Sequence, residues 1–440
     1  MNRTYSLGVA TGVPARAAPF PSDSARDGAR AAAHAAAGPP LAGRIFLGLL
    51  ERLRVGQLAL TLPSGERRTY GHAAEAAGTV PRTGDGPPCS AELVLHDWRA
   101  CARILRAGDI GFGEALYRGW IDSPDLPALL RLVLRNEDAV ATTIWGGRVS
   151  RLANRLRHAL RRNSRARSRQ NIHAHYDIGN DFYGLWLDPS WTYSAALFRG
   201  DPTLTLESAQ HAKYQRVVDK LGLARGMRVL EIGCGWGGFA LYAAQRGIAV
   251  HGITISPAQL ELAQQRVAAA GLQHLVTLEL RDYRDLTGRY DAIVSIEMFE
   301  AVGQVYWRRW FAAVHRLLAP GGRALVQSIT IAETRFAGYR ASSDFIRHYI
   351  FPGGMLPTPG RFIAGAARVG LVTRDVLAFG RDYAETLRRW RTRFDAAAPA
   401  VLALGLDAAF VRLWRLYLAY CEAGFEEGRT DVVQVLLQRE

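Results

Sequence analysis

The sequence predicts an α/β protein whose larger part is a doubly wound, mostly parallel sheet, with a smaller α+β domain before it. The first observation is an apolar run ending at Ile232 that passes directly into four glycines within 233–238, the pattern of a buried strand, a tight turn and a helix. The second is the alternation of short apolar segments with helical patterns between residues 228 and 329. Such alternation is typical of a parallel sheet covered by helices on both faces.

Changes in composition divide the chain into four segments. Residues 1–41 are rich in Ala, Pro, Gly and Ser and hold few large apolar groups, so we expect a disordered tail. Residues 42–146 are expected to form the α+β domain, and residues 147–170 a basic amphipathic helix that runs into a linker. Residues 171–440 are expected to form the domain with the large sheet, which carries an insertion at about 331–369.

The apolar periodicities place the elements of each domain in order. In the smaller domain they predict helices and short strands at 45–53, 57–62, 92–96, 99–107, 113–119 and 125–134. In the larger domain they predict alternating strands and helices at 228–232, 237–246, 249–255, 257–270, 275–280, 291–298, 305–318 and 323–329. A strand at 371–379, two helices and a strand at 432–437 then complete a seven-stranded sheet with a reversed hairpin at its edge.

Composition restricts the class of protein. The chain has 440 residues, of which 49% are hydrophobic, and this suits two globular domains. No run of about 18 apolar residues occurs, so no transmembrane helix is expected, and the start of the sequence lacks the apolar core of a secretory signal. The four cysteines are widely separated, which indicates neither a metal site nor a disulfide framework and suits a reducing cytoplasm.

The positive charge is concentrated in one segment. The net charge of +15 predicts an acidic partner. The alternative explanation is genomic base composition, which can by itself produce an Arg-rich protein. Residues 147–169 contain nine arginines and no acidic residue. This pattern favours either a solvated helix between domains or docking onto an anionic membrane surface. The segment has no interleaved aromatic residues for base stacking, so we expect no nucleic-acid partner.

The residues around the glycine turn discriminate between nucleotide cofactors. Sheets that bind NAD carry an acidic residue about 20 positions after the glycines, and phosphate-binding loops carry Gly-Lys followed by Ser or Thr. This chain has neither: Glu231 precedes the turn, and the second strand ends in Thr-Ile-Ser-Pro-Ala-Gln at 254–259. This pattern favours S-adenosylmethionine. Asp282 and Tyr283 follow the third strand, where they would accept the adenine amine and pack on its ring.

Seven motifs occur in order within residues 171–440. They are His-Tyr-Asp-Ile-Gly-Asn-Asp-Phe-Tyr at 175–183, Thr-Tyr-Ser at 192–194, Leu-Glu-Ile-Gly-Cys-Gly-Trp-Gly-Gly at 230–238, Ile-Thr-Ile-Ser at 253–256, Met-Phe-Glu-Ala-Val-Gly at 298–303, Tyr-Ile-Phe-Pro-Gly-Gly at 349–354 and Cys-Glu-Ala-Gly-Phe at 421–425. Together they resemble the cyclopropane-fatty-acyl-phospholipid synthases and the related mycolic acid methyltransferases. The resemblance implies the Rossmann-like sheet of the class I methyltransferases.

This resemblance also implies a reaction and a location. In the family, the cis double bond of a phospholipid acyl chain attacks the sulfonium methyl of S-adenosylmethionine. The resulting carbocation loses a proton and closes a cyclopropane ring, with a bound bicarbonate ion as the proposed base. Such a site must be dry and walled by apolar or aromatic groups. The implied enzyme is cytoplasmic and binds peripherally to the anionic inner face of a membrane, where it acts on unsaturated phospholipids. A homodimer is compatible with the resemblance.

Individual residues receive roles from the same resemblance. Glu300 and Tyr383 match residues that help hold the bicarbonate, and Gln327 belongs to the same pocket. Cys421 matches a cysteine proposed as catalytic, although the chemistry requires no thiol nucleophile and a buried helix cysteine is more often part of a core. The expected cofactor-binding residues are Tyr176, Tyr193, Ser194, Gly233, Cys234, Gly235, Thr254, Ser256, Gln259, Asp282 and Tyr283.

Two positions depart from the family pattern. Many members have a cysteine after Tyr-Ser where this chain has Ala195, and a histidine near the end of the fifth strand where it has Gln327. The Gln327 side chain can donate a hydrogen bond to an anion, whereas that of Ala195 cannot. The identity of the base therefore stays open, as does the product, for which a methylene or methyl-branched chain is the alternative to the ring.

Other interpretations of particular features compete with this one. A nucleic-acid-directed methyltransferase or binder would account for the net charge, but the sequence lacks the catalytic Cys pair or Asn-Pro-Pro-Tyr motif that it predicts. A cofactor-binding protein without catalysis would account for the departures at Ala195 and Gln327. The apolar residues of 339–359 favour the wall of an acyl tunnel, with plain packing as the alternative.

Overall fold

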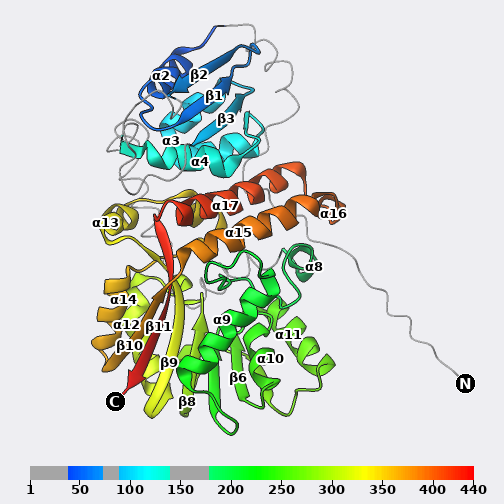
Figure 1. Ribbon diagram of the computed structural model, residues 1–440, viewed down its shortest axis with the longest axis vertical. Helices are drawn as coiled ribbons and strands as arrows, with labels where there is room; N and C mark the ends of the chain where they lie inside the picture. The colour runs from blue at the N-terminus through cyan, green and yellow to red at the C-terminus, as the bar shows by residue number, and fades with distance from the viewer. Residues whose placement is uncertain (1–37, 73–88, 139–177) are drawn as a thin grey trace, which may run out of the picture.

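A computed structural model describes residues 38–72, 89–138 and 178–440. The expected tail therefore lies almost entirely outside the described residues, and the basic segment 147–170 lies wholly outside them. The described residues form two sheets, and Figure 1 shows them one above the other with two long helices between. Among the described residues, no helix combines the length and the apolar character needed to cross a bilayer.

Within residues 38–72 and 89–138, the smaller domain has a four-stranded sheet of order β2-β1-β3-β4 and three helices. Strand β1 pairs antiparallel with β2 and parallel with β3. Its elements are α2 (Leu41–Leu50), β1 (Gln57–Thr61), β2 (Arg67–Gly71), β3 (Ser90–Leu95), α3 (Arg99–Tyr117), β4 (Ile121–Asp122) and α4 (Leu126–Arg135). The expected α+β architecture is present, but β2 and β4 were not predicted, since both are short and β2 is largely polar.

Helix α3 is broken in the region where the sequence predicts a break. The sequence predicts separate helices at 99–107 and 113–119, and the structure has two helical halves that meet at a kink at Gly108, so the second half begins earlier than predicted. There φ is 60° and ψ is −131°, a conformation that glycine adopts without the steric cost of a Cβ atom. The apolar pattern continues past the kink, so both halves pack against the same core.

The larger domain is the predicted seven-stranded sheet, of order β10-β11-β9-β8-β5-β6-β7. Its strands are β5 (Arg228–Ile232), β6 (Ala249–Thr254), β7 (Val276–Leu280), β8 (Tyr290–Ile296), β9 (Leu318–Ile331), β10 (Leu371–Ala378) and β11 (Thr430–Arg439). Strands β5 to β9 run parallel, and β11 lies antiparallel between β9 and β10. The reversed hairpin predicted at the edge is confirmed.

Helices cover both faces of this sheet, as Figure 1 shows. They are α9 (Leu206–Leu221), α10 (Gly238–Ala244) and α11 (Pro257–Ala269) on one face, and α12 (Trp307–Leu317) and α14 (Pro359–Ala367) on the other. Helix α9 was not predicted, because charged and polar residues interrupt its apolar stripe. The short helices α8 (Asn180–Gly184) and α13 (Glu333–Ala341) lie nearer the boundary between the domains.

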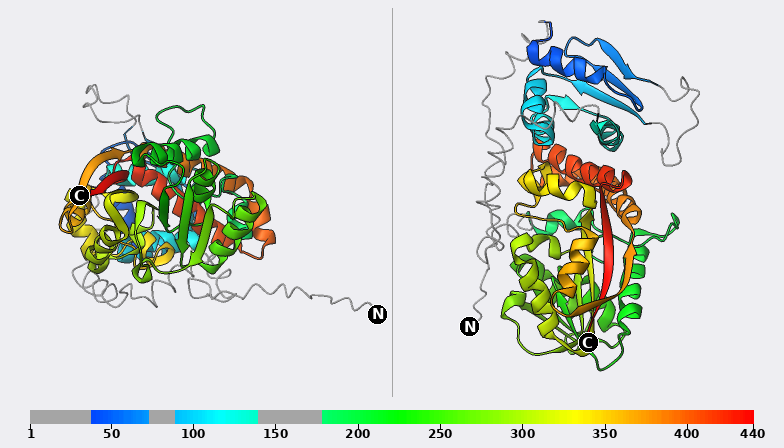
Figure 2. Two further views of the ribbon diagram at one scale, coloured as in Figure 1. Left: turned by 90° about the horizontal axis from the view of Figure 1, so that it is seen from below. Right: turned by 90° about the vertical axis from the view of Figure 1, so that its left-hand side faces the viewer.

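Helices α15 (Gly380–Ala396) and α17 (Ala408–Glu426) lie between the two sheets, with the short α16 (Ala398–Ala403) connecting them. Figure 2 shows from the side that the smaller domain rests on α17 at one end of the large sheet. Helix α17 packs against α3 and α4, and buried residues of both domains belong to one continuous core cluster. The domains are therefore joined by apolar packing as well as by the chain.

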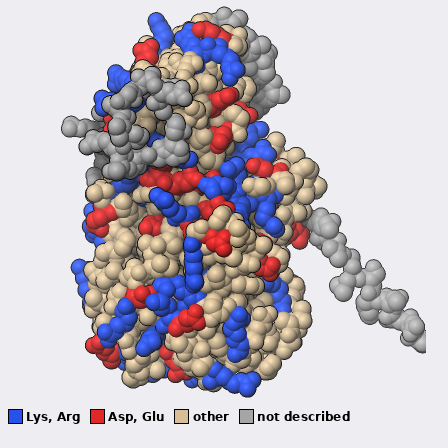
Figure 3. Space-filling view, viewed as in Figure 1, with Lys and Arg blue, Asp and Glu red and all other residues tan. Residues whose placement is uncertain are grey.

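Ion pairs reinforce this boundary. The guanidinium of Arg131 lies 3.0 Å from a carboxylate oxygen of Glu426, and that of Arg135 lies 2.9 Å from Glu427. Glu137 pairs with Arg335 and Arg429 of the larger domain at 2.7 and 3.0 Å. Figure 3 shows blue and red side chains gathered in this band. Because these groups are partly buried, their interaction is screened less by salt than that of fully exposed pairs.

Candidate functional site

The glycine turn after β5 has the geometry that the sequence predicts. Gly233, Gly235 and Gly237 have φ values of 86°, 52° and 79°, in the left-handed region. The N–H groups of Gly233 and Cys234 both donate to the carbonyl of Ile253 in β6, at 2.9 and 3.0 Å, and this fixes the turn at the carboxyl edge of the sheet. A Cβ atom on Gly238 would lie 2.6 Å from the Tyr214 hydroxyl, so the following helix needs glycine for close approach.

Most of the expected cofactor residues line one cavity at this turn. Those on its wall are Tyr193, Ser194, Gly233, Cys234, Gly235, Thr254, Gln259, Asp282 and Tyr283. Ser256 instead caps helix α11, where its hydroxyl accepts from the Gln259 N–H at 3.3 Å. Both carboxylate oxygens of Asp282 accept from Arg284, which holds this side chain in place beside the ring of Tyr283. Tyr176 lies outside the described residues.

Glu231 is a buried carboxylate on the cavity wall to which the sequence assigned no role. Its Oε2 atom has no hydrogen-bond partner among the described residues, and burial raises the pKa of this carboxyl well above its ordinary value. Lys213, also buried, donates to Ser194 Oγ at 2.6 Å, and burial lowers the pKa of its ammonium to about 7. An unsatisfied buried carboxylate oxygen beside a glycine turn fits the cationic amino-acid end of S-adenosylmethionine.

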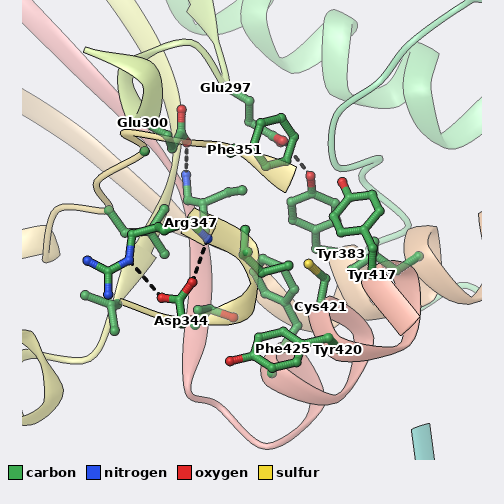
Figure 4. A pocket seen from close by; sticks show the side chains of 18 of the residues that line it. Glu297, Glu300, Asp344, Arg347, Phe351, Tyr383, Tyr417, Tyr420, Cys421 and Phe425 are labelled. Atoms are coloured by element: carbon green, nitrogen blue, oxygen red, sulfur yellow. Dashed lines mark hydrogen bonds and ion pairs between the residues drawn. The ribbon is translucent and has the colours of Figure 1, made fainter. Parts of the chain in front are cut away.

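A second cluster surrounds Glu297, which follows directly after β8. Its Oε1 atom accepts from the backbone N–H of Ala195 and from Nε2 of Gln327, both at 2.8 Å. Its Oε2 atom accepts from the Tyr383 hydroxyl at 2.7 Å, the contact drawn in Figure 4. The structure therefore brings Tyr383, Gln327 and Ala195 together as the sequence predicts, but the carboxylate that joins them is Glu297. The signal that would have found it is a lone acidic residue at the end of a buried strand.

Glu300 occupies a neighbouring but different position. It lies in the 3₁₀ helix η3 (Phe299–Ala301), and its Oε1 atom accepts from Ser328 Oγ at 3.0 Å and from the Ile329 N–H. It makes no direct hydrogen bond to Tyr383 or Gln327, although it lines the same cavity as Glu297 and Tyr383. Burial and the nearby charge of Glu297 raise the pKa of Glu300 to about 8, so its carboxyl is largely protonated at neutral pH.

Cys421 lies on α17 among aromatic side chains. Figure 4 shows its sulfur beside Tyr417, Tyr420 and Phe425, facing the cavity. Burial raises the pKa of the Cys421 thiol far above its ordinary value, so the group is a thiol and not a thiolate at neutral pH. The geometry thus gives Cys421 the role of an apolar wall residue.

The cavity extends from the glycine turn into the smaller domain. It measures about 900 Å³, passes Glu297 and Glu300, and continues between the domains. Residues of the insertion line its middle, namely Tyr339, Ile346, Phe351, Met355 and Leu356. Apolar residues of the smaller domain line its far part, among them Phe46, Leu49, Leu53, Leu58, Leu93 and Leu129. One end thus suits a polar cofactor and the other a long apolar chain.

A seven-stranded sheet with its reversed hairpin, a glycine turn at the carboxyl edge and a buried acidic residue beside that turn define an S-adenosylmethionine-dependent methyltransferase. A family model described as mycolic acid cyclopropane synthetase matches residues 163–435. The chain belongs to this family, which includes the cyclopropane-fatty-acyl-phospholipid synthases that the motifs resemble.

Individual relatives agree with this assignment. The chain is 41% identical over 377 residues to the tuberculostearic acid methyltransferase UfaA1 of Mycobacterium tuberculosis, a match that covers 81% of this chain and 86% of that protein. It is 37% identical over 346 residues to the cyclopropane-fatty-acyl-phospholipid synthase of Escherichia coli, covering 77% of this chain and 85% of the relative.

A solved structure adds the cofactor. The crystal structure of mycolic acid cyclopropane synthase CmaA1 complexed with SAH and CTAB is 33% identical, with a TM-score of 0.58, and the match covers 62% of this chain and 98% of that one. The chain is therefore an enzyme that uses S-adenosylmethionine and transfers its methyl group to lipid acyl chains.

Proposed function

We propose that the acceptor is the cis double bond of an unsaturated acyl chain in a phospholipid. The observation that carries this proposal is the single cavity that leads from the glycine turn past Glu297 into the apolar interior of the smaller domain. An acyl chain lying in it would hold its double bond near the cofactor end and its apolar length among leucine and phenylalanine side chains. Relatives named for fatty-acyl products support the same acceptor class.

The cavity wall also suits the chemistry of an alkene. Bound S-adenosylmethionine supplies an electrophilic methyl group on a sulfonium. The double bond attacks that methyl carbon, a C–C bond forms while the S–CH₃ bond breaks with its electron pair left on sulfur, and the other alkene carbon becomes a carbocation. Tyr417, Tyr383 and Phe351 present aromatic rings to the cavity, and such rings exclude water and stabilise a nearby positive charge. An alkene is a weak nucleophile, so its reaction rate gains most when the double bond is held in line with the methyl group in such a dry site.

A phospholipid head group would find positive charge where the domains meet. Arg335 and Arg429 line the cavity there together with Glu137, with which both pair, so the three side chains carry one net positive charge. A guanidinium binds a phosphodiester through charge-assisted hydrogen bonds. This placement supports a phospholipid over an uncharged lipid as the bound form.

Two products follow from the same carbocation. Loss of a proton from the transferred methyl with ring closure gives a cyclopropane, which we propose as the product. A hydride shift before that proton loss gives a methylene branch. The relative with the longer of the two matches is named for a methyl-branched product, tuberculostearic acid, and this favours the branched chain as the second candidate.

One assay tests acceptor and product together. The purified chain is incubated with S-adenosylmethionine and liposomes of a monounsaturated phosphatidylglycerol, and the acyl chains are analysed by mass spectrometry. We expect a chain heavier by one methylene group, and NMR of that product distinguishes the ring from the branch. Liposomes of the saturated lipid are the control. Methylation of added RNA without any lipid product would refute the proposal.

Membrane docking is proposed to depend on the arginines of residues 147–169. Replacing Arg155, Arg157, Arg161 and Arg162 by Gln should weaken co-sedimentation with anionic vesicles by up to about 4 kcal/mol at low salt, since each basic residue contributes about 1 kcal/mol. The difference should shrink as salt increases. As a matched control, replacing the exposed arginines 225, 289, 308 and 323 removes the same charge from the larger domain. An equal loss in the control would mean that only net charge matters.

A further inference from the structure

The Glu297 carboxylate lies at the centre of a hydrogen-bond cluster in the reaction pocket. Glu297 Oε1 and Oε2 accept three hydrogen bonds from three different parts of the chain, namely the Ala195 N–H, Gln327 Nε2 and the Tyr383 hydroxyl. The carboxylate lines the same cavity as the glycine turn and the aromatic wall. The lengths, 2.7 to 2.8 Å, are those of well-formed hydrogen bonds.

These donors leave no suitable place for bicarbonate. The family resemblance implies a bicarbonate ion held beside Tyr383 and Gln327, but both side chains already donate to Glu297. A carboxylate presents two oxygens on a planar carbon, as bicarbonate does, so Glu297 satisfies the same donors. A separate bicarbonate would face the negative charge of Glu297 and lack those donors, so the residues present do not fit it.

We propose that the Glu297 carboxylate is the base of the reaction and takes the place of the bicarbonate ion. This inference rests on the proposed function, because it requires the carbocation formed by methyl transfer to an alkene. Glu297 is then a catalytic residue supplied by the chain itself, and the enzyme does not depend on dissolved bicarbonate.

The backbone at Glu297 supports a functional reason for this residue. Its φ is 49°, and in the described ranges only Trp191 and Arg199 share a positive φ among residues other than glycine. A side chain in this region costs about 1–2 kcal/mol relative to the ordinary helical conformation. Such strain persists at sites where function requires it. Glycine would adopt this φ without that strain. The Glu297 carboxylate is therefore present at a local cost in backbone energy.

The surrounding charges favour one ionised carboxylate in the pocket. Burial raises the pKa of Glu297, while the Tyr383 hydroxyl, the charge of Lys213 and the other two donors act in the opposite direction. Glu300, beside it, has its pKa raised to about 8 and holds a proton at neutral pH. Donors to a carboxylate favour its ionised form, and Glu297 receives three of them.

Proton transfer to Glu297 completes the reaction. Methyl transfer has formed one C–C bond and broken the S–CH₃ bond, whose electron pair stays on sulfur. One Glu297 oxygen then takes a proton from the transferred methyl carbon. The electrons of that C–H bond form the second C–C bond of the ring, or a C=C bond if a hydride has shifted first. The proton ends on Glu297 and passes to solvent after product release.

Two substitutions at Glu297 test the inference. Glu297→Gln keeps the size of the side chain but not its basicity, and we expect product formation to fall by at least about 10²-fold, the contribution typical of a positioned base. Glu297→Gly also removes the carboxylate, relieves the positive φ and frees the three donors. We expect this variant to be inactive in bicarbonate-free buffer and to recover activity when sodium bicarbonate is added.

Binding and stability are measured on the same proteins. Calorimetric titration with S-adenosylmethionine should give wild-type affinity for both variants, and their melting temperatures should show that both remain folded at the assay temperature. The exposed Glu261→Gln on α11 is the matched control for loss of a carboxylate. Wild-type activity should not change when bicarbonate is removed.

Three results would overturn the inference: a wild type that requires bicarbonate, a Glu297→Gln variant with wild-type rates, or a larger loss on Glu300→Gln than on Glu297→Gln. Each presupposes a wild type that modifies the acyl chain. If the wild type modifies no unsaturated phospholipid at all, it is the proposed function that fails, so the two failures are distinguishable.

Discussion

Replacing Gly235 by Asn should abolish cofactor binding and leave the fold intact. Gly235 lies in the turn after β5 with φ at 52°, and an added Cβ atom would meet no protein atom within 4 Å. Asn tolerates this left-handed conformation better than other side chains do. Its side chain would enter the part of the cavity next to the turn, where the cofactor must lie. We expect the affinity for S-adenosylmethionine to fall about 100-fold, or ~2.8 kcal/mol, by calorimetry.

Gly222 provides a matched control for this substitution. It caps the carboxyl end of α9 with φ at 64°, and it too has no neighbour within 4 Å of the Cβ position. Gly222→Asn should keep both the wild-type melting temperature and the wild-type affinity. A similar loss of affinity in both variants would show that the effect is not local to the turn.

A bulky residue at Cys421 should block the acyl chain and spare the cofactor. Cys421 faces the middle of the cavity from α17, so a tryptophan there would fill space between the reaction pocket and the smaller domain. We expect Cys421→Trp to lower product formation by at least about 100-fold, equivalent to ~2.7 kcal/mol of transition-state stabilisation. Affinity for S-adenosylmethionine should remain that of the wild type.

Cys421→Ala separates this explanation from a catalytic thiol. Because burial keeps the thiol protonated, its removal should change product formation only a few-fold. A loss as large as that of Cys421→Trp would instead assign the sulfur a chemical role. Melting temperatures of both variants control for overpacking, which costs typically about 1–3 kcal/mol in a core.

The fold of the larger domain was predictable because its signals are local and repeated. The glycine turn and the alternation of strands and helices fixed the order of β5 to β9, and the comparison with CmaA1 agrees. Elements without a strong apolar period escaped prediction: α9 alternates charged and apolar residues, and β4 is two residues long. Tertiary packing, not local propensity, decides such segments.

Residues of the site were predictable from the sequence only where the family resemblance assigns them a role. Tyr383 and Gln327 were singled out by resemblance, and the structure places them in one pocket. Glu297 was missed because its role arises from contacts with positions 102 and 86 residues away in sequence, Ala195 and Tyr383. A resemblance identifies only residues that the family shares. The proposed role of Glu297 depends instead on contacts that exist only in the folded chain.

The insertion of β11 between β9 and β10 has a consequence for biosynthesis. Among the described strands, β10 pairs only with β11, so it has no such partner until residues 430–439 emerge from the ribosome. Gln434 of β11 also donates to Gln327 Oε1 at 3.0 Å, which turns the Gln327 amide nitrogen toward Glu297. Domains often fold from the amino terminus during translation. The Gln327 amide, however, is oriented by β11, which is synthesised after the other parts of the pocket. The hydrogen bond from Gln434 that orients the Gln327 amide therefore forms only after β11 has paired with β9.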